Sequence, residues 1–185
     1  KLLNRDMTKT QSNTIKAAKL ATSHLGMPNY FVTLNPHLMG SLSASDQHFN
    51  PSRFVTIIDS TMDSSVRKYL GSNWGRFERL PSCRFVLEDK SNQAIGNQKT
   101  HLHCHGQIWI PSEIKKPANS FVNAFREQFS HHALKMRNVL SISGPTLPPI
   151  THIDEWDQEK CPDYEFKYWN LDPDHIHLWG RHSAS

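Results

Sequence analysis

Three histidines alternate with small or apolar residues near the middle of the chain, in the segment 100–110, which reads THLHCHGQIWI. A period of two is typical of a β-strand, because successive side chains point to opposite faces. We therefore expect His101, His103 and His105 on one face of a strand. Neutral imidazole is a common metal ligand, and side chains on one strand face can close on a single ion. The alternative is a solvated polar face, and three histidines within five residues argue against it.

The composition is that of a globular domain. Its 185 residues, with 37% hydrophobic and 21% charged residues, are enough to bury one core. A net charge of +4 permits a nucleic-acid partner without requiring one. Because the chain lacks an initiator methionine, we expect a domain excised from a longer protein. We expect one domain over 1–185, with an N-terminal helical segment over about 1–28.

The spacing of the cysteines and the length of the apolar runs indicate the cellular compartment of the protein. Cys83, Cys104 and Cys161 are far apart and form no Cys-x-x-Cys pair, which predicts neither a disulfide framework nor a zinc knuckle. No apolar run approaches the ~18 residues of a membrane span. Segment 1–5 is basic, but the residues that follow are polar and do not form the apolar core of a signal peptide. We therefore expect a cytoplasmic protein with no membrane partner.

The remaining pattern predicts an α+β fold, in which helices pack against an antiparallel sheet. The segment 40–52 is predicted as a loop, and 54–58 fits either a short strand or the start of a helix. The predicted strands, besides the histidine strand, are 30–34, 83–88 and 150–153, and the predicted helices are 9–25, 61–80, 163–169 and one capped by Ser120.

Two helices have a predicted buried face. Ile15, Ala18 and Leu20 are expected near one face of the first helix. After Ser120, three phenylalanines recur every four residues and form a core-facing stripe, at positions 121, 125 and 129.

Other charged residues and histidines receive less specific interpretations. The basic side chains interleaved along 61–80 favour a solvated helix face over a DNA contact. His131 and His132 are expected to face opposite directions on a helix, in solvent. His175 and His177 have little room for a flanking strand, which favours a surface or minor-groove contact over a ligand role.

A carboxylate is expected beside the histidines. The strand 83–88 is the predicted antiparallel partner of the histidine strand, across a polar connection over 89–99 that contains Gly96-Asn97. This pairing brings Glu88 close to His101 or His103, and a carboxylate there suits Mg²⁺ or Mn²⁺. A register shift of one residue would present Asp89 instead. A surface glutamate at the end of a strand is the alternative.

Tyr164, Lys167 and Tyr168 share one face of a predicted helix, because residues three and four apart are neighbours. Phenol is a poor nucleophile at neutral pH, since its pKa is ~10. A nearby ammonium or metal ion would stabilise the phenolate and allow attack on a phosphate. The pattern Tyr-x-x-Lys is common by chance, so its weight depends on the histidine strand.

Three segments, in this order, resemble the motifs of the HUH endonucleases that initiate rolling-circle replication (Rep proteins). Segment 31–36 (FVTLNP) resembles the first motif, the histidine strand resembles the second, and segment 164–168 (YEFKY) resembles the third, Tyr-x-x-Lys. About 70 residues separate the first motif from the second and about 60 separate the second from the third. The resemblance covers about 30–169, most of the chain.

The resemblance implies a ferredoxin-like or RRM-like catalytic domain with a divalent metal, Mg²⁺ or Mn²⁺. The ion is held by two histidines and a polar ligand from the adjacent strand, which Glu88 matches best. The overlapping frames of the histidine motif leave two choices; His103 and His105 are favoured as core ligands, with His101 near the rim.

The implied reaction nicks single-stranded DNA, usually at an origin hairpin. Tyr164 attacks the scissile phosphate beside Lys167, which leaves a 5′-phosphotyrosyl enzyme and a free 3′-hydroxyl. Tyr168 stands at the spacing of a second nucleophile, and the alternative is that it only packs. A helicase and host replication proteins are further partners that the resemblance allows, in a bacterial, phage or plasmid setting.

Three other functions remain open from the sequence. Segment 101–105 also fits the histidine-triad nucleotide hydrolases, in which the last histidine, here His105, attacks a phosphate without metal. Against this, Gly106 and Gln107 stand where that pattern has apolar residues, and Tyr164 has no role. HUH transposases and relaxases share the histidine motif. A non-catalytic origin-binding module would keep the fold without the reaction.

Overall fold

The structure is a computed structural model, and it describes residues 9–36, 51–88, 103–139, 148–159 and 176–180. These segments form a five-stranded antiparallel sheet with three α-helices, so the predicted α+β class is confirmed. The strand order is β4-β1-β3-β2-β5. The elements are α1 (Lys9–Thr22), η1 (Ser23–Leu25), β1 (Tyr30–Asn35), α2 (Pro51–Leu70), η2 (Gly71–Arg76), β2 (Ser82–Glu88), β3 (His103–Trp109), α3 (Ala118–Val139), β4 (Ile150–Glu155) and β5 (Ile176–Trp179), where η denotes a 3₁₀ helix.

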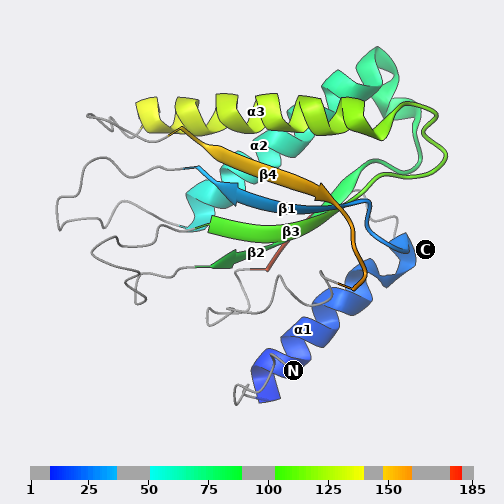
Figure 1. Cartoon of the computed structure of the whole chain (residues 1–185), viewed down its shortest axis with the longest axis vertical. Coiled ribbons are helices and arrows are strands. Elements are labelled where there is room, and N and C mark those ends of the chain that lie inside the picture. The colour runs from blue at the N-terminus through cyan, green and yellow to red at the C-terminus, as the bar shows by residue number, and fades with distance from the viewer. Residues whose placement is uncertain (1–8, 37–50, 89–102, 140–147, 160–175, 181–185) are drawn as a thin grey trace.

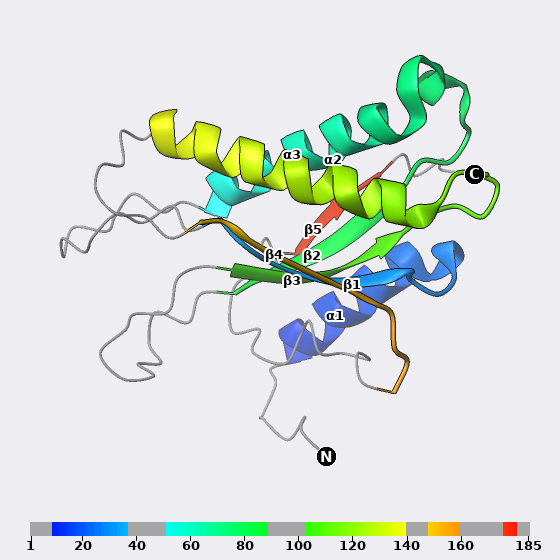
Figure 2. The same ribbon diagram turned by 45° about the horizontal axis from the view of Figure 1, so that its top comes forward.

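Helices cover both faces of the sheet. Helices α2 and α3 lie on one face and α1 lies on the other, which the turned view of Figure 2 shows most clearly (Figures 1 and 2). The main core fills the space between the sheet and α2 and α3, and it contains the predicted phenylalanine stripe of α3. Alternate strand residues point into it, including Val32, Leu34, Cys104 and Ile108. The residues between them, His103 and His105 among them, therefore face the α1 side.

Helix α1 is held to the sheet by a small apolar cluster and a buried arginine. Ile15 and Ala18 pack on Val86, as their predicted face requires. Leu20 is 74% exposed, so its predicted place on that face is wrong. A residue two positions beyond Ala18 is rotated by about 200° around the helix axis, which turns it toward solvent.

Arg84 of β2 lies under α1 with only 4% of its surface exposed. Its Nη1 donates to the carbonyl of Ala18 at 3.2 Å and to Oγ1 of Thr22 at 2.6 Å, and its Nη2 donates to Oε1 of Gln107 at 2.8 Å. Burying a guanidinium is costly, and these three hydrogen bonds offset part of that cost. Arg84 therefore joins α1, β2 and β3 through directed contacts.

The boundaries of α2 and α3 correct three predictions. Helix α2 begins at Pro51, inside the predicted loop 40–52, and residues 54–58 are helical, which is one of the two alternatives that the sequence left open. The helix predicted over 61–80 ends at Leu70, because Gly71 adopts φ +74° and turns the chain into η2. Helix α3 begins at Ala118, so Ser120 is not its cap; the amide of Ser120 donates to the carbonyl of Pro117 at 3.0 Å.

Candidate metal centre on the histidine strand

The histidine strand is β3, the central strand of the sheet, as the alternation predicted. His103 and His105 project from its α1 side. Their ring centres are 5.0 Å apart and the ring planes are nearly perpendicular, at 87°. Two imidazoles that each bind one ion through a nitrogen about 2.1 Å away have ring centres roughly 4.5–5.5 Å apart. The spacing of this pair therefore fits two ligands of a single ion.

The pairing of β2 with β3 sets the position of the candidate carboxylate. The two strands are antiparallel, as predicted, and Glu88 is the Cα partner of His103. Cross-strand partners lie on the same face of a sheet, so Glu88 belongs to the face that carries the histidines. The register shift considered for Asp89 is absent. In this register, Glu88 of β2 lies beside the end of β3 that carries His103 and His105.

Two residues of β1, the strand that carries the first motif, hold the ring of His105. Thr33 is its Cα partner, and Oγ1 of Thr33 lies 2.8 Å from Nδ1 of His105. The ring of Phe31 stacks on the imidazole, with 5.8 Å between ring centres and 17° between planes. His105 is only 7% exposed. Its ring is therefore fixed in plane and in rotation by two residues about 70 positions earlier in the sequence.

The other predicted site residues are not all described. His101, Tyr164, Lys167 and Tyr168 lie outside the described residues, and for Glu88 the structure describes only its place in the strand. Within the described segments, no group of three histidine, cysteine, aspartate or glutamate side chains is arranged to hold a metal. The structure thus brings together two of the predicted ligands, His103 and His105.

Gly106, directly after His105, lets β2 and β3 approach closely. A Cβ built on it would lie 2.2 Å from Cδ1 of Phe85 and 2.4 Å from the carbonyl oxygen of Arg84. Phe85 is the Cα partner of Gly106, and its ring occupies the space of the missing side chain. Sequence reasoning noted Gly106 only as part of the motif. The structure gives it a packing role beside the candidate ligands.

His177 is not the surface residue that the sequence suggested. Residues 176–179 form β5, which pairs with β2, although the sequence suggested little room for a strand there. The Nε2 atom of His177 lies 2.7 Å from Oδ1 of Asp59 on α2. This contact ties the edge strand β5 to α2, which leaves His177 pointing away from the α1 side of the sheet.

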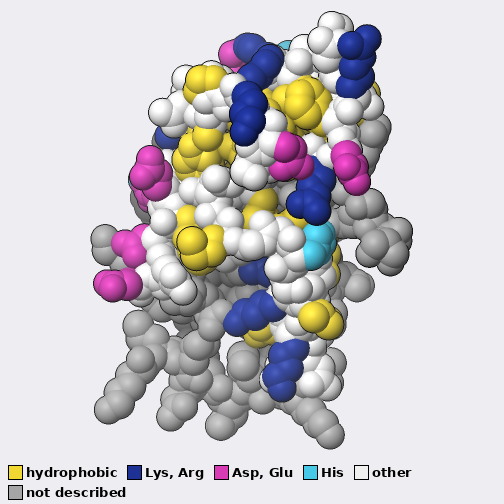
Figure 3. Space-filling model, turned by 90° about the vertical axis from the view of Figure 1, so that its right-hand side faces the viewer, with side chains coloured by type: hydrophobic (Ala, Val, Ile, Leu, Met, Phe, Trp, Pro, Cys, Tyr) yellow, Lys and Arg dark blue, Asp and Glu magenta, His cyan; other side chains and the backbone are white. Residues whose placement is uncertain are grey.

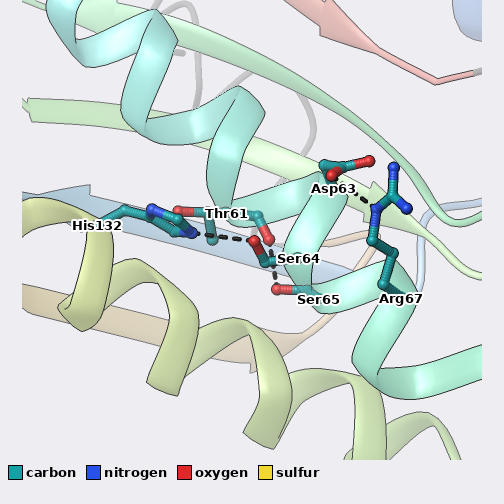
Figure 4. Close-up of polar contacts among 6 residues, drawn as sticks. All are labelled: Thr61, Asp63, Ser64, Ser65, Arg67 and His132. Atoms are coloured by element: carbon teal, nitrogen blue, oxygen red, sulfur yellow. Dashed lines mark hydrogen bonds and ion pairs between the residues drawn. The ribbon is translucent and has the colours of Figure 1, made fainter. Parts of the chain in front are cut away.

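A second histidine contact joins α2 to α3 (Figure 4). Nε2 of His132 lies 3.0 Å from Oγ of Ser64, so His132 is not simply solvated as expected. Burial lowers the pKa of His132, and His131 and Lys135 lower it further, which favours the neutral imidazole. Below this pair, Oγ of Ser65 donates to the carbonyl of Thr61 at 2.6 Å. The contact between Ser64 and His132 thus links two helices on the face opposite the candidate metal centre, whereas the bond from Ser65 lies within α2.

A pocket of about 710 Å³ lies at the far end of β3. It is formed by the segments 24–29, 78–82 and 109–113, and Trp109 lines it. Trp109 is six residues from His103, so about 20 Å of strand separates the two positions. The molecular surface at this end carries interspersed acidic, basic and apolar side chains (Figure 3). The pocket is therefore separate from the histidine pair.

Comparisons with protein-family models, with curated proteins and with solved structures found no match to this chain. In the segments that the structure describes, no helix combines the length and apolarity of a membrane span. Cys83 and Cys104 are buried as thiols, and burial, with a smaller contribution from Asp59, raises the pKa of Cys83 well above its usual value.

Proposed function

We propose that the chain is a metal-dependent, site-specific endonuclease and strand transferase for single-stranded DNA, of the HUH type. The observation that carries this proposal is the histidine pair on β3: two buried or half-buried imidazoles, 5.0 Å apart, on a face shared with Glu88. A solvated polar strand would not require one of these rings to be stacked, hydrogen-bonded and 93% covered, as His105 is.

The arrangement of the strands also supports the HUH assignment. The first and second motifs resemble those of rolling-circle initiators, and here they lie on adjacent strands, β1 and β3. The family takes its third metal ligand from a strand adjacent to the histidine strand, and Glu88 occupies such a position on β2. Segments 31–36 and 83–88 therefore flank the histidines on both sides.

The proposed roles follow from the chemistry of the residues. His103, His105 and Glu88 would hold Mg²⁺ or Mn²⁺, with His101 at the rim, and the Lewis acidity of a bound ion would polarise the scissile phosphate. Tyr164 attacks the phosphorus, a 5′-phosphotyrosine forms, and the 3′-oxygen leaves as a hydroxyl after protonation. Lys167 stabilises the phenolate beside it. The reverse attack by the 3′-hydroxyl rejoins the strand, because the phosphodiester energy is kept in the tyrosyl ester.

The substrate proposed for this site is single-stranded DNA, with an origin hairpin as its natural form and replication initiation as its biological role. A cytoplasmic location in a bacterial, phage or plasmid setting, with a helicase as partner, belongs to the same proposal. The net charge of +4 is compatible with a DNA partner.

The test is a covalent capture assay. The protein is incubated with Mn²⁺ and a pool of end-labelled single-stranded oligonucleotides, and a DNA adduct is sought on a denaturing gel. We expect an adduct for the wild type and none for Tyr164→Phe or His105→Ala. His131→Gln serves as the matched histidine control, because His131 is exposed on α3, on the other side of the sheet.

Each outcome has a defined meaning. An adduct that Tyr164→Phe loses and Tyr168→Phe keeps supports a single-tyrosine nuclease, whereas loss in both variants supports two nucleophiles. DNA binding by wild type and Tyr164→Phe without any adduct would contradict the proposal and favour the binding module. Hydrolysis of a mononucleotide without metal would favour the histidine-triad alternative.

A further inference from the structure

We propose that Thr33 is a positioning residue that holds His105 with Nε2 directed to the ion. This inference rests on the proposed function, since it concerns the metal centre of the proposed nuclease. It gives the first motif a role, because Thr33 and Phe31 both belong to segment 31–36 and both contact His105.

The hydrogen bond identifies the nitrogen that binds metal. An imidazole can ligate through Nδ1 or through Nε2, and the hydrogen bond of one nitrogen decides which. Nδ1 of His105 lies 2.8 Å from Oγ1 of Thr33, so an ion cannot approach that nitrogen. His105 therefore ligates through Nε2.

Ligation through Nε2 places the ring proton on Nδ1, where it needs an acceptor. A threonine hydroxyl has two lone pairs and accepts such a proton. Because His105 is 7% exposed, an Nδ1–H without an acceptor would be poorly hydrated. Thr33 satisfies this donor in the metal-bound state. Removing comparable partners of metal-binding histidines typically weakens metal binding 10–100-fold.

The neighbours of Thr33 leave its hydroxyl directed to His105. On its other side, the Cα partner of Thr33 is His152 of β4. Nε2 of His152 lies 2.8 Å from Oδ2 of Asp154, so this ring has its own carboxylate partner. Phe31 adds a second constraint, because its stacked ring fixes the plane in which the imidazole of His105 lies.

The variant that tests this inference is Thr33→Val, which keeps the shape and removes the hydroxyl. Thr33→Ser restores the hydroxyl and serves as the rescue variant. Thr151→Val is the matched control on β4, because the structure shows no hydrogen-bond partner for the buried Oγ1 of Thr151 among the described residues. Thermal unfolding followed by circular dichroism verifies that each variant is folded.

The first readout is the dissociation constant for Mn²⁺, measured by calorimetry on the whole protein without DNA. We expect it to rise about 10–100-fold in Thr33→Val and to remain close to wild type in Thr33→Ser and Thr151→Val. The second readout needs no variant of Thr33. In Mg²⁺-loaded wild type, nitrogen NMR of His105, assigned with His105→Gln, is expected to show the proton on Nδ1.

The failures are distinguishable. Unchanged Mn²⁺ affinity in a folded Thr33→Val, or a proton on Nε2 of His105 in the Mg²⁺-loaded wild type, overturns the role of Thr33 and leaves the nuclease proposal standing. If Thr33→Val does not fold, the NMR readout decides. A wild type that binds neither ion overturns the metal centre and this inference with it.

Discussion

Gly106 offers the most direct test of how closely β2 and β3 approach beside the candidate ligands. In Gly106→Ala, the added methyl group would lie 2.2 Å from Cδ1 and 2.7 Å from Cε1 of Phe85, and 2.4 Å from the carbonyl oxygen of Arg84. Real carbon atoms do not approach so closely. The ring of Phe85 is fully buried, and the carbonyl belongs to the backbone of the paired strand, so neither group can turn aside.

Two opposing effects determine how much unfolding free energy Gly106→Ala is expected to lose. Overpacking a buried position typically costs about 1–3 kcal/mol, and a clash with backbone puts this site at the upper end of that range. Replacing glycine recovers about 0.5–1 kcal/mol, because the unfolded chain becomes less flexible. The net loss of unfolding free energy is therefore about 2–2.5 kcal/mol. For a chain of this size, such a loss lowers Tm by about 4–10 °C.

The assay is thermal and urea unfolding followed by circular dichroism, with Gly75→Ala as the control. Gly75 has no atom within 4 Å of an added Cβ, so the same substitution there is expected to be neutral or slightly stabilising. We also expect Gly106→Ala to weaken Mn²⁺ binding, because a displaced β3 moves His105. A Gly106→Ala protein as stable as Gly75→Ala would refute the close strand approach and the reasoning built on it.

Three further predictions concern contacts away from the metal centre. Arg84→Met removes the buried donors under α1 and should cost about 2–4 kcal/mol in urea unfolding. Arg67→Met, which loses only exposed contacts to Asp63 and Trp74, should cost less than about 1 kcal/mol, and equal effects of the two substitutions would contradict the buried network. Because the folded-state pKa of His132 is lowered from 6.5, the unfolded chain takes up its proton first, and stability is lost as pH falls below about 6.5. The loss of stability on acidification should be smaller in His132→Gln. If the unfolding free energies of the two proteins fall in parallel as pH is lowered, His132 is not the group responsible. His177→Ala and Asp59→Ala should each cost about 1 kcal/mol and be less than additive together; full additivity would show that the two residues do not interact in solution.

The parts of the fold that sequence patterns predicted are those governed by local periodicity. The alternation in 100–110 predicted β3 and the shared face of His103 and His105. The spacing of Phe121, Phe125 and Phe129 predicted the buried face of α3. The pairing of β2 with β3 was predictable because the two strands are consecutive in the sequence and a polar connection joins them, and it brought Glu88 opposite His103.

The errors occurred where a periodic pattern continues past a backbone change. Trp74 and Phe77 extend the apolar spacing of α2, yet Gly71 ends that helix with a left-handed residue. That glycine was a local signal for the end of the helix. Arg84 also had a local signal. It is a cation among the apolar residues of a predicted strand, and such a position indicates a buried polar contact.

Other features have no local signal at all. The bond from Thr33 to His105 joins residues 72 positions apart, and no spacing rule predicts which polar side chains meet across two strands that pair in the sheet but lie far apart in the sequence. The strand β5 was missed because a four-residue edge strand carries little periodic pattern. Its pairing with β2 and its contact with Asp59 stabilise it instead.

The central claim is that a tyrosine of this chain becomes joined to DNA. The most direct measurement is mass spectrometry of the protein after reaction with Mn²⁺ and single-stranded DNA, nuclease digestion of the adduct and proteolysis. The account predicts a nucleotide attached through its 5′-phosphate to Tyr164. Attachment to His105, or no attachment at Tyr164 or Tyr168 under conditions in which the DNA is cleaved, would contradict it.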